Sequence, residues 1–161
     1  MNLYLLRHAD AEDFAASRKD FDRALSERGR EVMEVVAAAF ERVAEPKTIW
    51  HSPYLRAKET ALFIAGKMPK AKIRESPMLV PEADPREIFV AIGGGKTGDV
   101  LLVGHQPHLG RALGLAVTGS ADIEIPMHKG SIARVSFSGT RPSPPGSLKW
   151  LISPSLAQQL R

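Results

Sequence analysis

The chain has 161 residues, of which 43% are hydrophobic and 25% are charged, values close to the average of globular proteins. This composition excludes a disordered or collagen-like chain, and the length predicts a single domain over residues 1–161. The absence of cysteine excludes disulfides, thiolate metal sites and a cysteine nucleophile. The first apolar run, residues 3–6, is too short for a signal peptide or a membrane span, so we expect a cytoplasmic protein.

The net charge of +4 is unevenly distributed along the chain. Residues 1–45 carry a net charge of −3 and residues 46–161 carry +7, which favours an anionic ligand. Basic residues occur singly, and aromatic residues make up only 6% of the chain. A surface for nucleic acid combines clustered cations with stacking rings. We therefore expect neither a nucleic acid nor a membrane as partner.

The first third of the chain predicts a strand followed by a helix. Residues 2–7 form a short apolar run that is typical of a buried strand. Ser26 is suited to cap a helix, and apolar side chains then recur at helical spacing from Val32 to Val43. Pro46 ends the pattern, because proline lacks the amide hydrogen that a helix interior needs.

A second strand and helix follow directly. Residues 48–51 predict a strand, and Ser52 and Pro53 then offer a helix cap and a favourable first helical residue. We expect this helix to run to about Lys67. Residues 71–75 predict a third, weaker strand.

The remaining residues continue the alternation. Asp84 is suited to cap a helix, residues 99–104 (DVLLVG) form the most strand-like run, and another helix begins near Pro107. Two late strands, residues 132–137 and 148–152, flank a proline-rich loop. This alternation predicts an α/β fold, a three-layer sandwich with a mostly parallel central sheet and helices on both faces.

Chemically active side chains follow three of the predicted strands. Arg7 and His8 end the first strand, Arg56 lies in the first turn of the helix after the second, and His105 follows the strand at residues 99–104. Each of them alone is typical of a surface turn or a solvated helix. Ligands of open α/β sheets bind at the carboxyl ends of the strands, and guanidiniums fit phosphate oxygens well. If the strands are neighbours, the joint placement predicts a phosphate site.

Other suggestive residues are interpreted as structural. His51, His108 and His128 lack metal-ligand spacing, so we predict no metal site. The run GGGKTG at residues 93–98 looks like part of a nucleotide-binding P-loop, but Val90 stands where that motif needs its first glycine. The run also follows a predicted helix instead of a strand, so it is interpreted as a turn at a helix C-terminus.

Four segments, taken together and in order, resemble the histidine phosphatase superfamily, which includes the cofactor-dependent phosphoglycerate mutases. They are LYLLRHADAED (3–13), DRALSERGR (22–30), SPYLRAKETA (52–61) and VGHQPHLG (103–110). The short chain, the sequence RHAD in place of RHG, and the SPYLRA segment are most similar to the small SixA-type phosphohistidine phosphatases. The resemblance implies a phosphoglycerate mutase-like fold and a phosphatase activity.

The resemblance also implies roles for particular residues. His8 would be the nucleophile, and Arg7, Arg56 and His105 would bind the phosphoryl group. The attacking nitrogen of His8 must be unprotonated, a state that the two neighbouring guanidiniums favour by like-charge repulsion. A phosphohistidine intermediate would form and water would hydrolyse it, with no metal or other cofactor. Ser52 is expected to contact phosphate in addition to capping its helix.

The sequence leaves the general acid open. Larger members of the superfamily place a carboxylate after the third strand, where this chain reads LVPEADPREIF and offers Glu82 and Asp84. Asp84 is already explained as a helix cap, so Glu82 is the candidate. Asp84, Asp10 and the absence of any acid remain as alternatives.

The expected substrate is a phosphohistidine side chain of another protein. Few residues remain between Lys67 and Glu82 to build a lid, and enzymes that enclose small metabolites need such loops. The alternatives are a small-molecule phosphomonoesterase on the same scaffold and a non-catalytic phosphate-binding module. Retention of both histidines and both arginines argues against the binding module. The oligomeric state is not predicted.

Overall fold

A computed structural model describes residues 1–14, 19–95 and 98–159. The helices and strands follow one another in this order: β1 (Asn2–Arg7), the 3-10 helix η1 (Asp20–Asp22), α2 (Glu27–Phe40), β2 (Thr48–His51), α3 (Leu55–Lys67), β3 (Lys72–Glu75), the 3-10 helix η2 (Pro77–Leu79), α4 (Pro85–Gly93), β4 (Val100–Gly104), α5 (His108–Thr118), β5 (Ile132–Ser136), β6 (Ser147–Ile152) and α6 (Pro154–Gln159). Among these residues, no helix has the length and apolar character that crossing a bilayer requires.

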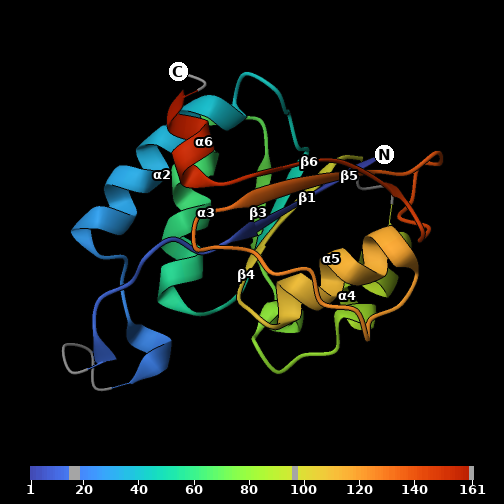
Figure 1. Ribbon diagram of the computed structural model, residues 1–161, viewed down its shortest axis with the longest axis horizontal. Helices are drawn as coiled ribbons and strands as arrows, with labels where there is room; N and C mark the ends of the chain where they lie inside the picture. The colour runs from blue at the N-terminus through green and yellow to red at the C-terminus, as the bar shows by residue number, and fades with distance from the viewer. Residues whose placement is uncertain (15–18, 96–97, 160–161) are drawn as a thin grey trace.

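The six strands form one sheet in the order β3-β2-β4-β1-β5-β6. The pairs β3-β2, β2-β4 and β4-β1 are parallel, whereas β5 runs antiparallel to both of its neighbours. Helices α2, α3 and α6 cover one face of the sheet, and α4 and α5 cover the other (Figure 1). The predicted three-layer, mostly parallel α/β fold is therefore confirmed.

The central strands are apolar on both faces because helices cover both faces. In β1, Leu3 and Leu5 pack in the core beneath α4 and α5, while Tyr4 and Leu6 pack in the core beneath α2 and α3. Strand β4 is buried along its whole length. A strand in this position needs no polar face, which explains why the sequence shows continuous apolar runs instead of alternation.

The helix that follows Ser26 is confirmed, with two corrections. The Ser26 hydroxyl accepts a hydrogen bond from the amide of Gly29 at 3.0 Å, as a capping side chain does. The helix ends at Phe40, and Val43, which was expected on its apolar face, is 51% exposed in the turn that precedes Pro46. The buried face lies instead at Gly29, Met33, Val36, Ala37 and Phe40.

The start of α3 differs from the prediction. The helix begins at Leu55 with Tyr54 at its N-cap position, so Ser52 does not cap it and Pro53 is not its first residue. The other predicted cap is confirmed, since Asp84 accepts a hydrogen bond from the amide of Arg86 at 2.9 Å. Helix α4 ends in the glycine run, with Gly94 at its C-cap, as predicted. Lys96 and Thr97 of that run lie outside the described residues.

The two edge strands are both unsuited to pairing with a further strand. Strand β3 is exposed along its whole length and reads KIRE. Strand β6 is irregular, because its register against β5 shifts between Arg134 and Val135 and leaves Lys149 without a partner residue. Charged side chains and bulges at sheet edges oppose the addition of further strands.

Candidate active site

The strands β2, β4 and β1 lie side by side, so their carboxyl ends meet at one place. The loop after β1 is tied to β4 by a hydrogen bond from the amide of His8 to the Gly104 carbonyl at 3.0 Å. The loop after β2 is tied to the same strand by a bond from the amide of Ser52 to the Val103 carbonyl at 2.9 Å. The structure thus brings together the three strand ends from which the sequence predicts a site.

The His8 side chain is buried and held in one tautomer. Its Nδ1 lies 2.7 Å from the carbonyl oxygen of Ala9. Because a carbonyl only accepts hydrogen bonds, Nδ1 carries the ring proton and Nε2 has a free electron pair. The Ala9 amide is in turn fixed by Thr60 Oγ1 at 3.2 Å, and that hydroxyl donates to the Arg56 carbonyl at 2.7 Å. Helix α3 therefore helps to position the His8 ring.

The surroundings of His8 keep its ring uncharged. Burial, together with the positive charges of Arg56, Arg7 and Lys129, lowers the pKa of His8 to about 3, although the hydrogen bond to the Ala9 carbonyl acts in the opposite direction. Arg56 Nε donates to His8 Nε2 across 3.3 Å, which marks the side of the ring where the free electron pair lies. At neutral pH this nitrogen is therefore buried and unprotonated, the state in which an imidazole is able to act as a nucleophile.

Two buried nitrogen atoms beside His8 have no hydrogen-bond partner in the described part of the chain. One is Arg7 Nε, whose neighbouring Nη1 donates to the Met127 carbonyl at 2.7 Å. The other is Nδ1 of His105, a residue whose ring centre lies 4.9 Å from that of His8. Burying a donor without a partner is costly, so these atoms indicate a position that an anion fills.

Ser52 determines the orientation of the His105 ring. Its hydroxyl oxygen is fully buried and lies 2.9 Å from His105 Nε2, and it also accepts from the amide of Tyr54 at 3.4 Å. When the hydroxyl proton is donated to Nε2, the ring proton of His105 stays on Nδ1, the unpartnered atom. Burial lowers the pKa of His105 to about 2, together with the charges of His8 and Arg56.

Arg56 is held in place by Asp20, a residue that the sequence analysis missed. Arg56 Nη1 donates to the Asp20 carbonyl at 2.6 Å, and Nη2 pairs with the Asp20 carboxylate at 2.9 Å. The same carboxylate pairs with Arg23 at 3.0 Å. Burial raises the pKa of Asp20, but the hydrogen bonds from Arg23 and Arg56 outweigh it and the pKa is lowered. Residues 12–22 show no periodicity that would place Asp20 beside α3.

An aromatic pair, Phe21 and Tyr54, lies next to these cations and was also missed. The ring centres of Phe21 and Tyr54 are 5.0 Å apart, and the Tyr54 ring lies 4.8 Å from that of His105. The guanidinium carbon of Arg56 lies 4.7 Å from the centre of the Tyr54 ring. A signal for Tyr54 existed in the SPYLRA segment, two residues before Arg56, whereas nothing in the sequence marks Phe21.

The three candidate acids lie in different environments. Glu82 is exposed, and its negative charge contributes to raising the pKa of Tyr54, after burial. Asp84 is exposed and caps α4, where the amide of Arg86 lowers its pKa. Asp10 pairs with Lys129 at 2.7 Å and accepts from Ser26 Oγ at 2.9 Å, and its bond to Lys129 lowers its pKa. Of these three carboxylates, Asp84 and Asp10 form hydrogen bonds and ion pairs with described residues, whereas Glu82 forms none with them.

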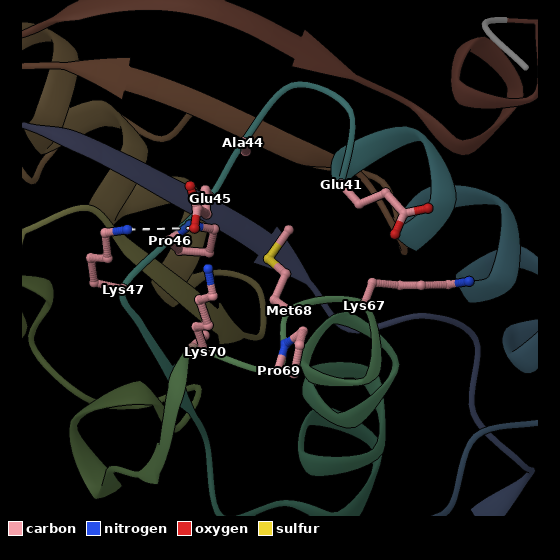
Figure 2. Close-up of a pocket in the computed structure, with 10 residues that line it drawn as sticks. Glu41, Ala44, Glu45, Pro46, Lys47, Lys67, Met68, Pro69 and Lys70 are labelled. Atoms are coloured by element: carbon pink, nitrogen blue, oxygen red, sulfur yellow. Dashed lines mark ion pairs between the residues drawn. The ribbon is translucent and has the colours of Figure 1, made fainter.

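A separate pocket of about 260 Å³ lies at the opposite end of the sheet, where β2 and β3 begin (Figure 2). Lys47, Lys67 and Lys70 line it together with Glu45, which pairs with Lys47 at 3.6 Å. It contains none of the histidines or arginines described above. In the described ranges, no group of three or more His, Asp and Glu side chains is placed to hold a metal ion.

Comparison with known proteins identifies the family. Residues 3–80 match the model of the histidine phosphatase superfamily, branch 1. The chain is also 31% identical over 118 residues to an uncharacterised protein of Picosynechococcus sp., covering 68% of this chain and 69% of that protein. The chain therefore belongs to the histidine phosphatase superfamily, the family that its four sequence segments resemble.

Solved structures confirm the fold at low sequence identity. The protein histidine phosphatase SixA in complex with tungstate has a TM-score of 0.82 at 24% identity, covering 96% of this chain and 98% of that one. The alpha-ribazole phosphatase from Shigella flexneri has a TM-score of 0.72 at 15% identity, covering 96% and 97%. A mycobacterial glucosyl-3-phosphoglycerate phosphatase in complex with VO3 has a TM-score of 0.67 at 19% identity, covering 92% and 97%.

Proposed function

We propose that this protein is a phosphatase that removes the phosphoryl group from phosphohistidine in other proteins, through a phosphohistidine intermediate on His8. The observation that carries the proposal is the free electron pair on His8 Nε2, held beside Arg56 and beside the unpartnered Nδ1 of His105. A nucleophile and an anion site are thus adjacent. A module that only bound phosphate would not need an unprotonated histidine in one fixed tautomer.

The first step transfers the phosphoryl group to His8. Arg56 Nε gives up its hydrogen bond to His8 Nε2 in favour of a phosphoryl oxygen, the released electron pair of Nε2 attacks phosphorus in line, and the bond between phosphorus and the substrate nitrogen breaks. That electron pair returns to the substrate ring, which leaves as neutral imidazole when its other nitrogen already carries a proton. Arg7, Arg56 and His105 Nδ1 stabilise the charge on the phosphoryl oxygens. The Ala9 carbonyl stabilises the positive charge that develops on the His8 ring.

The second step releases phosphate. Water attacks the phosphorus of the intermediate, the bond to His8 Nε2 breaks, and the electron pair returns to His8. Both protons of the water leave with the phosphate, as dihydrogen phosphate that then ionises according to pH. We assign Ser52 a role through the His105 ring that it orients, in place of the direct phosphate contact expected from the sequence. Because Arg7 and Arg56 supply positive charge to the phosphoryl oxygens, we propose a reaction without a metal.

The substrate class is supported by the shape and chemistry around the site. The residues between α3 and Glu82 are taken up by β3 and η2, so little chain is available there for a lid. A site without a long lid segment at this position suits a phosphorylated side chain of a protein. The imidazole of phosphohistidine also leaves more readily than an alkoxide, so its reaction depends less on a general acid. We propose Glu82 as the acid that an ester substrate would need.

A panel of substrates tests the proposal. We expect a phosphohistidine peptide to have at least a tenfold higher kcat/KM than a phosphoserine peptide, a sugar phosphate, phosphoglycerate and a nucleoside monophosphate. Glu82→Gln should slow ester hydrolysis more than phosphohistidine hydrolysis. If a small phosphate ester has a kcat/KM at least tenfold higher than the phosphohistidine peptide, the protein is instead a phosphomonoesterase. Two of the structural neighbours are named as phosphatases of small phosphate esters.

A further inference from the structure

The aromatic pair Phe21 and Tyr54 forms a surface that begins at the phosphate site and reaches solvent. The Tyr54 ring contacts the His105 ring at 4.8 Å between centres, and Phe21 extends the surface outward with 46% of its area exposed. An exposed aromatic ring contributes less to the packing of the core than a buried one, so its place beside the proposed anion site suggests a role in binding. The pair therefore borders the cluster of His105 and Arg56 from which the phosphate site is built.

The guanidinium that borders the phosphate site also fixes both rings. Arg56 packs its guanidinium carbon over the Tyr54 ring at 4.7 Å. Two further bonds from Arg56 hold Asp20, the residue next to Phe21 in η1. The rings are therefore positioned before any substrate arrives. Binding of a substrate ring against them then costs little conformational entropy of the protein.

The border around the aromatic pair includes one carboxylate, Glu82, that a cationic ring could approach, while the Tyr54 ring already packs against Arg56. Asp20 is paired with Arg23 and Arg56, whereas Glu82 forms no ion pair with any of the described residues and acts on the Tyr54 hydroxyl by its negative charge. The faces of aromatic rings attract cations as well. The site thus has two unlike parts: Arg7 and Arg56 surround the position of the phosphoryl group, and an aromatic border lies next to it.

We propose that Phe21 and Tyr54 form a leaving-group subsite that stacks on a planar cationic ring attached directly to the phosphorus, the imidazolium of phosphohistidine. This inference rests on the proposed function and names residues that determine its specificity. A sugar phosphate offers no planar ring, and a nucleoside monophosphate carries its base a whole sugar away from the phosphorus. Phosphohistidine alone among these joins an anionic phosphoryl group directly to a flat cation.

The test compares phosphohistidine with phosphoramidate, which has the same phosphorus–nitrogen bond and no ring. The measured quantity is the ratio of the two kcat/KM values, because damage to the phosphate site affects both substrates and leaves the ratio unchanged. Tyr54→Leu should lower the ratio at least tenfold, mainly through KM for phosphohistidine, and Phe21→Leu about threefold. Tyr54→Phe keeps the ring, and Phe14→Leu removes an exposed aromatic residue outside the pair. Both should keep the ratio within twofold.

The outcomes separate this inference from the proposed function. A wild-type enzyme that hydrolyses phosphohistidine well, and whose ratio is unchanged in both Tyr54→Leu and Phe21→Leu, would overturn the subsite alone. A wild-type enzyme that prefers small esters would overturn the proposed function and the subsite with it. Should Tyr54→Leu fail to fold, Phe21→Leu decides, because it changes an exposed side chain whose only ring contact among the described residues is Tyr54.

Discussion

The two ends of the parallel strands both carry basic side chains, but they hold them differently. At the carboxyl ends, Arg56 and the imidazoles of His8 and His105 are buried against one another. At the amino ends, Lys47, Lys67 and Lys70 surround the pocket of Figure 2 on flexible, exposed side chains. Exposed lysines are well solvated without a ligand, whereas buried guanidiniums and imidazoles have lost that solvation.

The difference supports the carboxyl ends as the proposed functional site. The pocket at the amino ends is lined by exposed lysines, one of which, Lys47, pairs with Glu45. The carboxyl ends carry Arg7 Nε and His105 Nδ1, which are buried and have no hydrogen-bond partner among the described residues. The cost of burying these donors, and not the volume of a pocket, is therefore our reason for proposing an anion site at this end.

Removal of the nucleophile should have the largest effect. We expect His8→Ala to reduce hydrolysis of the phosphohistidine peptide by about 10⁴-fold or more, because no other group can form the covalent intermediate. The variant should also accumulate no phosphoenzyme when quenched during turnover. His128→Ala, at an exposed position, is the matched control and should retain activity. A loss of less than tenfold in His8→Ala would contradict the assignment.

Acid should destabilise the carboxyl-end cluster steeply. The folded pKa values of His8, His105 and His108 lie at about 3, 2 and 4, all below the ordinary value of 6.5. Below pH 6.5 the unfolded chain therefore binds more protons than the folded one, so stability falls as the pH falls toward 4. At about 1.4 kcal/mol per pH unit for each group, the free energy of unfolding should drop by roughly 3–4 kcal/mol between pH 6 and 5.

Urea titrations at a series of pH values measure this slope. His108→Leu should reduce it by about a third, because His108 is fully buried and neither of its ring nitrogens has a partner in the described part of the protein. A stability that stays constant between pH 7 and 5 would show that the histidines are not held neutral by burial.

Substitution of Arg56 should have the next largest effect. Arg56→Ala should lower kcat by about 10²- to 10³-fold, because the charge on the phosphoryl oxygens loses a fixed donor. Lys70→Ala changes a cation of the opposite pocket and should alter kcat less than twofold. Equal losses in the two variants would mean that general positive charge, and not the buried guanidinium, supports the reaction.

The smallest effect is expected from Ser52. Ser52→Ala should lower kcat about tenfold, because His105 then loses the partner that keeps its proton on Nδ1. Ser52→Thr retains a hydroxyl and should recover part of the activity. Vanadate binding measured on the same variants should weaken in parallel with kcat. Unchanged kcat in Ser52→Ala would show that the His105 ring is oriented without the hydroxyl.

Sequence reasoning found the strand ends because local signals define them. Arg7, His8 and His105 each follow a buried apolar run, and the fold brings such ends together wherever the strands are neighbours. The cap of α3 was predicted wrongly at Ser52, since a serine before a proline satisfies the local pattern. In the structure its hydroxyl instead reaches His105, a partner 53 residues away.

The residues that were missed depend on contacts between distant segments. Asp20 and Phe21 lie in a short 3-10 helix, in a stretch without hydrophobic periodicity, and they meet α3 only after the chain has folded. The periodicity of a sequence does not predict contacts of this kind between a loop and a distant helix. The general acid stayed open for the same reason, because a carboxylate in a loop is recognised by its neighbours and not by its spacing.

The charged edges of the sheet have a consequence for molecular recognition. Strand β3 exposes lysine, arginine and glutamate, and β6 is interrupted at Lys149, so neither edge offers a regular row of amides and carbonyls to an extended peptide. If the substrate is a protein, as we propose, these edges disfavour its capture by strand addition, which binds almost any extended segment. Selectivity would then come from contacts to the phosphorylated side chain and its immediate neighbours. Such a surface favours weak, transient binding of the protein substrate.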